Sequence, residues 1–141
     1  MPTTRNLAIL IFEDVEVLDF CGPFEVFSVA NRFTDPPAFN VFTVAEKPGP
    51  VLTRGSLSVN PHHRLADCPR HDLLLVPGGQ GTRREMHHAV LTDWINRRAG
   101  PCRGAWAGRR RAFALQEELR PHARQDVAHG YLAAEVIRPD R

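Results

Sequence analysis

The 141-residue sequence has few cysteines and no long apolar run. Its three cysteines, Cys21, Cys68 and Cys102, show no paired spacing, so a disulfide framework is not expected. No apolar run reaches the roughly 18 residues that a membrane span needs, and the N-terminus shows no cleavable signal pattern. We therefore expect a one-domain cytoplasmic protein with no membrane partner.

Metal, nucleotide and nucleic-acid motifs are also missing. No H-E-x-x-H or C-x-x-C pattern occurs, so no metal site is predicted. The glycines at 78–81 lack both the Gly-Lys-Ser/Thr of a P-loop and the full G-x-G-x-x-G spacing, so no cofactor is expected. The basic run 109–111 near Trp106 is too short to predict nucleic-acid binding, and a solvated segment explains it better.

Strand and helix patterns alternate along the first 98 residues. Continuous or alternating apolar runs predict strands at residues 6–12, 38–45 and 73–76, and a hairpin at 51–60 around Gly55-Ser56. Helical spacing predicts a helix over residues 83–98. This order predicts an α/β fold with a parallel sheet covered by helices.

The first helix is predicted from the position of its proline. Pro23 is tolerated only near a first turn, so the helix is expected to begin around Asp19 to Cys21 and to end near Arg32. Asp19 alone is explained as an N-cap or first-turn acid that the helix dipole stabilises. Right-handed crossovers, however, place the turns after residues 6–12 and 73–76 at one sheet edge. Asp19 is expected to meet the Gly78 and Gly79 amides there, which makes it a candidate for catalysis.

The pattern weakens after Arg98. Residues 97–141 carry a net charge of +5, against −3 for residues 1–96, and no strand pattern occupies 99–111. Helices are plausible only at 112–119 and 130–136. We divide the chain into a core, residues 1–98, and a divergent Arg-rich continuation of the same domain, residues 99–141.

Two separate motifs resemble one family. The segments Asp14–Phe27 (DVEVLDFCGPFEVF) and Leu73–Glu85 (LLLVPGGQGTRRE) resemble the DJ-1/PfpI (ThiJ/PfpI) family, and more narrowly its isonitrile hydratase branch. The resemblance covers about residues 6–98. It implies a flavodoxin-like or class I glutamine amidotransferase-like parallel sheet between helices, incomplete here at the C-terminus, and commonly a homodimer. The branch also supplies the amidase-like half of some AraC-type transcriptional regulators.

The resemblance assigns roles to residues of this chain. Asp19 matches the family's active-site acid, and Gly79 matches the glycine whose N–H helps to form the oxyanion site. Gly78, Gly81, Thr82 and Cys21 are expected to line the substrate pocket. The resemblance to this branch implies a lyase activity. In that reaction a cysteine attacks an isonitrile, and hydration yields an N-substituted formamide.

The family's nucleophile is not found. It lies in a Val-Cys-Thr-Gly-like elbow, where this chain has Ala107–Arg111 (AGRRR), with Arg109 at the cysteine position. Arginine stays protonated and cannot attack, and Cys102 lacks the preceding strand that an elbow needs. We therefore expect catalysis to be impaired. The Arg-rich run motivates the hypothesis of a reading-frame disruption between about residues 99 and 111, with a truncated product.

Three alternatives remain open at this point. The chain is a hydratase or hydrolase descendant that retains Asp19 and Gly79, a small-molecule-sensing module that uses the same pocket without catalysis, or an unstable fragment. The absence of a helix-turn-helix domain from this sequence counts against an intact regulator. In the first two cases the partner is a small-molecule substrate or ligand.

Overall fold

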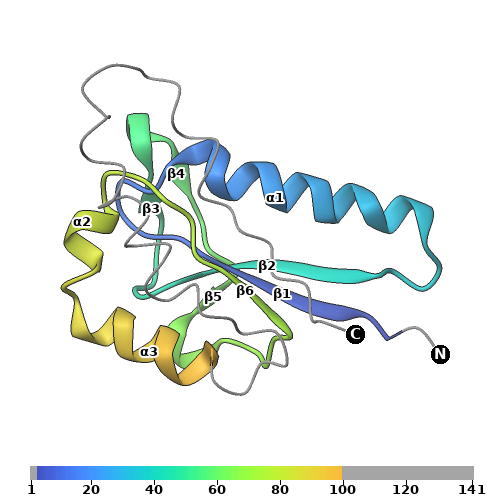
Figure 1. Cartoon of the computed structure of the whole chain (residues 1–141). Helices are drawn as coiled ribbons and strands as arrows, with labels where there is room; N and C mark the ends of the chain where they lie inside the picture. The colour runs from blue at the N-terminus through green and yellow to red at the C-terminus, as the bar shows by residue number, and fades with distance from the viewer. Residues whose placement is uncertain (1–2, 100–141) are drawn as a thin grey trace, which may run out of the picture.

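The computed structural model describes residues 3–99, and a four-stranded parallel sheet of order β5-β2-β1-β6 lies at its centre (Figure 1). Its strands are β1 (Arg5–Leu10), β2 (Phe39–Ala45), β5 (His63–Arg64) and β6 (Leu73–Leu75). The predicted hairpin forms a separate antiparallel pair, β3 (Val51–Leu52) with β4 (Ser58–Val59).

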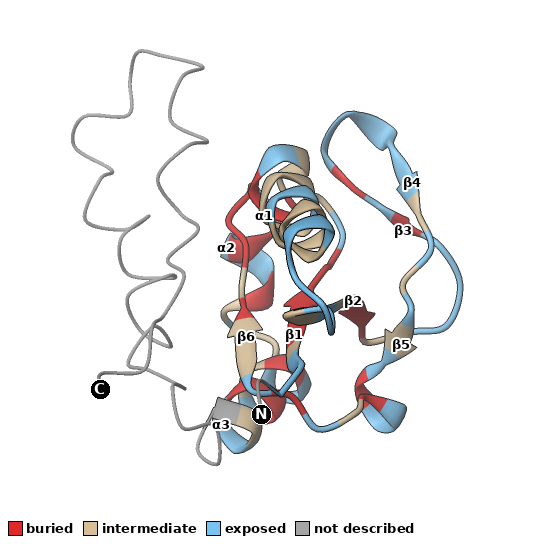
Figure 2. Cartoon of the chain, turned by 90° about the vertical axis from the view of Figure 1, so that its right-hand side faces the viewer, coloured by how far each residue is buried: buried red, intermediate tan, exposed pale blue. Residues whose placement is uncertain are grey.

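Helices cover both faces of the parallel sheet. The α-helices are α1 (Val17–Ala30), α2 (Thr82–Glu85) and α3 (Ala89–Ala99), and short 3-10 turns occupy Asn31–Phe33, Arg54–Ser56 and Leu65–Asp67. Figure 2 shows α1 on one side of the strands and α3 on the other. The predicted α/β class is thereby confirmed. Within residues 3–99, none of the helices combines the length and apolar character that crossing a membrane requires.

β1 is the innermost strand of the sheet. It pairs with β2 along one edge and with β6 along the other, and side chains 8–11 are fully buried. A strand covered on both faces needs apolar residues at every position, which is why this run lacks polar alternation. The strand ends at Leu10, two residues before the predicted end, although the Ile11 N–H still donates to Val44 O at 2.8 Å.

The first helix begins earlier than predicted. α1 starts at Val17, which makes Pro23 its seventh residue, so the placement of Pro23 in the first turn was wrong. The Asp19 N–H already donates to Glu16 O at 3.2 Å, and this bond forms the first turn before Pro23 is reached. Pro23 has no N–H to give to the carbonyl four residues earlier, that of Asp19.

The predicted helix over residues 83–98 is two helices. α2 ends at Glu85, and α3 begins at Ala89 after an intervening turn. The carbonyl of His88 accepts from Leu91 N and Thr92 N, so it opens a new helix. The His88 ring reaches across to Glu46, which holds this break in place.

β5 was not predicted, because its two residues are His63 and Arg64 in a polar segment. A neighbouring side chain fixes it: the Thr43 N–H donates to Nδ1 of His62 at 3.1 Å, and the His62 N–H donates to Thr43 O at 3.1 Å. The helices predicted at 112–119 and 130–136 lie outside the described residues.

Candidate functional site

Two strand-to-helix turns meet at the carboxyl edge of the sheet. The chain goes from β1 to β2 and β5 on one side, then returns to β6 on the other side of β1. In open α/β sheets such a reversal leaves a crevice at the carboxyl ends of the strands, where ligands bind. Here the turn after β1 and the turn after β6 lie at this reversal point of the sheet.

Backbone hydrogen bonds join the two turns. The Glu16 N–H donates to Gly78 O at 3.0 Å, and the Gly81 N–H donates to Asp14 O at 3.3 Å. Val15 and Gly79 lie opposite each other between these bonds as an isolated antiparallel bridge. The geometry of each turn therefore depends on the other.

Glycine is required at two positions by this close approach. Gly79 has φ of 133°, and a Cβ there would lie 2.5 Å from Glu16 N and 2.7 Å from Asp14 O. A Cβ on Gly81 would lie 2.0 Å from Glu13 O. These neighbours are backbone atoms, so they cannot move aside as a flexible side chain would.

Asp19 lies in the first turn of α1 and is almost fully buried, with 5% of its surface exposed. Burial, the largest cause, together with repulsion from Glu16, raises the pKa of Asp19 from 3.8 to about 6. A backbone hydrogen bond from Gly78 acts in the opposite direction. The structure thus brings Asp19 to the glycine turn, and its pKa suits a group that exchanges protons near neutral pH.

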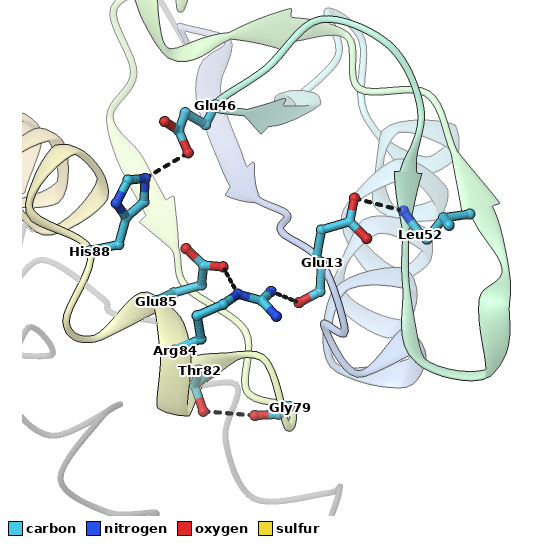
Figure 3. Close-up of polar contacts among 8 residues, drawn as sticks. All are labelled: Glu13, Glu46, Leu52, Gly79, Thr82, Arg84, Glu85 and His88. Atoms are coloured by element: carbon cyan, nitrogen blue, oxygen red, sulfur yellow. Dashed lines mark hydrogen bonds and ion pairs between the residues drawn. The ribbon is translucent and has the colours of Figure 1, made fainter.

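Thr82 fixes the glycine turn through two hydrogen bonds, one of which is drawn in Figure 3. Its Oγ1 and its N–H both donate to Gly79 O, at 2.7 and 3.1 Å. The Gly79 N–H, by contrast, makes no hydrogen bond to any other residue of the range 3–99. A fixed N–H of this kind can stabilise negative charge that develops on a bound molecule.

The two described cysteines, Cys21 and Cys68, are core residues and not activated nucleophiles. Cys21 is half-buried on α1 and packs against the hydrophobic core, and Cys68 is buried within it. Burial raises the pKa of both thiols, which is the reverse of what activates a nucleophile. Cys102 and Arg109 lie outside the described residues.

The predicted site residues therefore fall into two groups. Asp19, Gly78, Gly79, Gly81 and Thr82 are all buried at the junction of the two turns. Cys21 follows Asp19 by two residues on the helix, which turns it toward a different side, where it packs on the core. Glu16 was not predicted as a site residue, although the sequence places this acid three residues before Asp19, where the two carboxylates can repel each other.

The described residues hold no group of three or more His, Cys, Asp or Glu side chains arranged for a metal ion. Within residues 3–99, Glu16 is the acid whose charge acts on Asp19, and the groups that join the two turns are backbone N–H and C=O groups and the Thr82 hydroxyl. Such a set can move a proton and bind a developing oxyanion.

No family model matches the chain, but known proteins do. Isonitrile hydratase from Pseudomonas putida is 30% identical over 98 residues, which are 70% of this chain and 40% of that protein. A ThiJ/PfpI family structure from Pseudomonas syringae matches with a TM-score of 0.59 and 24% identity, over 71% of this chain and 40% of its own. A protein from Vibrio parahaemolyticus described as a transcriptional regulator matches with a TM-score of 0.55 and 19% identity, over 67% of this chain and 50% of its own. The chain spans 40% and 52% of the lengths of the curated relatives that it matches.

Proposed function

This chain belongs to the DJ-1/PfpI family, and from that premise we propose that it is a relative of cysteine-dependent isonitrile hydratases whose catalysis is impaired. Asp19 is the proposed acid/base, and the Gly79 N–H is the proposed oxyanion donor. The observation that carries the proposal is the buried Asp19 carboxyl, with its pKa raised to about 6, bonded to the glycine turn. The isonitrile substrate is taken from the name of the relative at 30% identity, isonitrile hydratase, and addition of water to an isonitrile gives a formamide.

Impairment follows from the thiols. Hydration of an isonitrile in this branch begins with attack by a cysteine, and the Val-Cys-Thr-Gly-like elbow is not in the sequence. Cys21 and Cys68 have raised pKa values, so neither supplies much thiolate at neutral pH. Within residues 3–99, Asp19 and Gly79 then form a binding corner without a nucleophile.

A second candidate function is a small-molecule sensor. The same corner can bind a ligand without converting it, and the fold is shared with a protein described as a transcriptional regulator. Gly78, Gly81 and Thr82 remain the proposed pocket residues in both cases, whereas Cys21 packs on the core and is not retained.

A second copy of this chain is the proposed protein partner. α1 leaves Leu18 and Val26 56% and 66% exposed, although a helix this apolar is normally covered on more than one side. A cytoplasmic location remains a prediction from the sequence.

Purified full-length chain incubated with cyclohexyl isonitrile separates the candidates. NMR follows formamide production, and thermal unfolding follows binding. We expect the isonitrile to raise the unfolding temperature of the protein without being converted. This result would support impaired catalysis and would favour the sensor function. Turnover that Asp19→Asn abolishes would show a competent enzyme and contradict impairment. Loss of near-UV circular dichroism would identify an unstable fragment instead.

A further inference from the structure

One side of α1 is not covered by the rest of the described chain. At about 100° per residue, seven positions fall within roughly one third of the helix circumference. They belong to α1 and to the 3-10 turn that continues it, and they are Leu18, Gly22, Glu25, Val26, Val29, Arg32 and Phe33. None of the seven is buried, and Figure 2 shows α1 mainly in the colours of half-buried and exposed residues. We call this set the open face of α1.

Phe33 is the most exposed of the large apolar side chains in residues 3–99, with 83% of its surface in water. Hydrogen bonds nevertheless fix the backbone around it. The Asn31 side chain donates to Phe39 O at 2.7 Å and accepts from the Phe39 N–H at 2.9 Å. The Thr34 hydroxyl accepts from the Ala38 N–H at 3.1 Å. An aromatic side chain on a fixed backbone loses little conformational freedom when it is bound, so it suits the role of an anchor at an interface.

Gly22 leaves a hollow in the same face. A Cβ placed on Gly22 would have no atom within 4 Å. Leu18 and Val26 lie one helical turn to either side of it, and both are more than half exposed. A hollow between two apolar side chains can receive a side chain of a second helix, as in the packing of ridges into grooves.

The charges of the open face fit an antiparallel pair of helices. Glu25 and Arg32 are exposed, and neither side chain makes an ion pair or hydrogen bond within residues 3–99. Two antiparallel copies related by a two-fold axis place each Glu25 near the Arg32 of the other copy, whereas parallel copies place like charges together. The midpoint of these two positions lies one residue, about 1.5 Å, from the midpoint of Gly22 and Phe33. The same axis therefore sets each Phe33 against the Gly22 hollow of the other copy.

We propose that α1 packs antiparallel against α1 of a second copy, with each Phe33 in the Gly22 hollow of the other copy and each Glu25 beside Arg32. This arrangement rests on the second copy proposed above as the partner, and it adds which residues meet. From Leu18 to Phe33 the face is about 22 Å long, so the helix pair alone buries less than the roughly 800 Å² per copy of a standard interface. We therefore expect a weak dimer, with a Kd in the micromolar range.

Disulfide trapping tests which positions meet. Gly22→Cys and Phe33→Cys, each made in the Cys102→Ser background, are purified separately and then mixed in a glutathione redox buffer. We expect the mixture to form at least about fivefold more linked dimer than either variant alone, because equal positions of the two copies lie about 16 Å apart, beyond the reach of a disulfide. Peptide mapping by mass spectrometry identifies the linked positions. Equal linkage in Gly22→Cys alone would show parallel helices, and a mixture without linkage between positions 22 and 33 would equally overturn the proposal.

A charge exchange tests the pairing independently. Glu25→Arg is expected to weaken self-association about fivefold in sedimentation equilibrium, because it sets two arginines together at each end of the helix pair. Glu25→Arg/Arg32→Glu is expected to restore self-association to within about twofold of the wild type. Asp93→Arg, at an exposed position of α3, is the matched control and is expected to change nothing. A folded double variant that associates as weakly as Glu25→Arg contradicts the pairing.

The oligomeric state separates this arrangement from the proposed partner. A wild-type chain that stays monomeric at every concentration contradicts both the second copy and the arrangement, whereas a dimer that fails the two tests contradicts the arrangement alone. Neither result bears on ligand binding at the corner of Asp19 and Gly79, which the isonitrile experiment measures.

Discussion

The Glu16 N–H donates a 3.0 Å hydrogen bond to Gly78 O, and this bond ties the turn after β1 to the turn after β6. On either side of it, a Gly78 backbone bond reaches the Asp19 carboxyl, and the Gly81 N–H reaches Asp14 O. The candidate site is thus a junction between two turns, and its properties depend on how closely their backbones approach.

Replacing either close-approach glycine should unfold the junction. Gly79→Ala and Gly81→Ala are each expected to lower the free energy of unfolding by about 2 kcal/mol or more, because the added Cβ would overlap backbone atoms of residues 13–16. Urea unfolding measures the loss. Gly22→Ala is the control: nothing lies within 4 Å of its Cβ, and Ala favours a helix, so a gain of about 0.5–1 kcal/mol is expected. Equal effects at all three positions would refute the close-approach argument.

The buried carboxyl makes stability fall as pH rises. The pKa of Asp19 is about 6 in the folded chain and near 3.8 when unfolded, so between these pH values the carboxyl is protonated in the folded state and ionised in the unfolded state. The loss of stability that comes from ionising this buried carboxyl is absent below pH 3.8 and complete above about pH 6. Asp19→Asn is therefore expected to stabilise the protein by roughly 2–3 kcal/mol at pH 8 and by little at pH 3.5. Urea unfolding of both proteins across this range checks it, and destabilisation by Asn at pH 8 would contradict it.

Glu16 is expected to act on Asp19 through charge. Glu16→Gln removes the second-largest cause of the raised pKa, so the pKa of Asp19 should fall while staying above 3.8, because burial remains. Carbon-13 NMR titration of the carboxyl measures the shift. In Glu25→Gln, on the same helix but exposed, the pKa of Asp19 should not move. A fall in both variants would point to a general charge effect.

The core thiols should react slowly. In Cys102→Ser the remaining cysteines are Cys21 and Cys68, whose pKa values burial raises. Both are expected to react with iodoacetamide at pH 7 more slowly than glutathione does, and to speed up when the protein is unfolded in urea. Rapid modification of either thiol in the folded protein would reveal an activated cysteine and weaken the case for impaired catalysis.

Self-association through α1 can be tested with a single substitution that introduces a charge. Val26→Glu is expected to convert a dimer to a monomer in light scattering, because Val26 is 66% exposed on an apolar helix. Val90→Glu, at a comparably exposed position on α3, is the control and should leave the mass unchanged. A wild-type monomer, or dissociation in both variants, would remove α1 as the interface.

Local apolar patterns were enough to predict β1, β2 and β6, three strands of the four-stranded parallel sheet. These strands have either continuous apolar residues or apolar residues that alternate with polar ones, and both patterns can be recognised in the sequence itself. The meeting of Asp19 with the glycine turn was predictable from the handedness of crossovers, since it needs only the order of strands and helices.

Long-range contacts decided what the sequence did not predict. β5 exists because His62 bonds to Thr43, and the break before α3 coincides with the reach of His88 to Glu46. α1 could start before Pro23 because Glu16 lies at the turn junction and its carbonyl accepts the Asp19 N–H. In each case the deciding partner is distant in sequence or is a backbone atom, so neither composition nor periodicity reports it.

The backbone character of the junction sets what sequence change it can absorb. Asp14, Glu16, Gly78 and Gly81 meet through N–H and C=O groups, which every residue except proline carries in full. Exchange of the Glu16 side chain therefore preserves these bonds, whereas one inserted or deleted residue in either turn would shift all of them together. Apart from the two close-approach glycines, Gly79 and Gly81, this corner of the protein forbids variation in length more than variation in side chain.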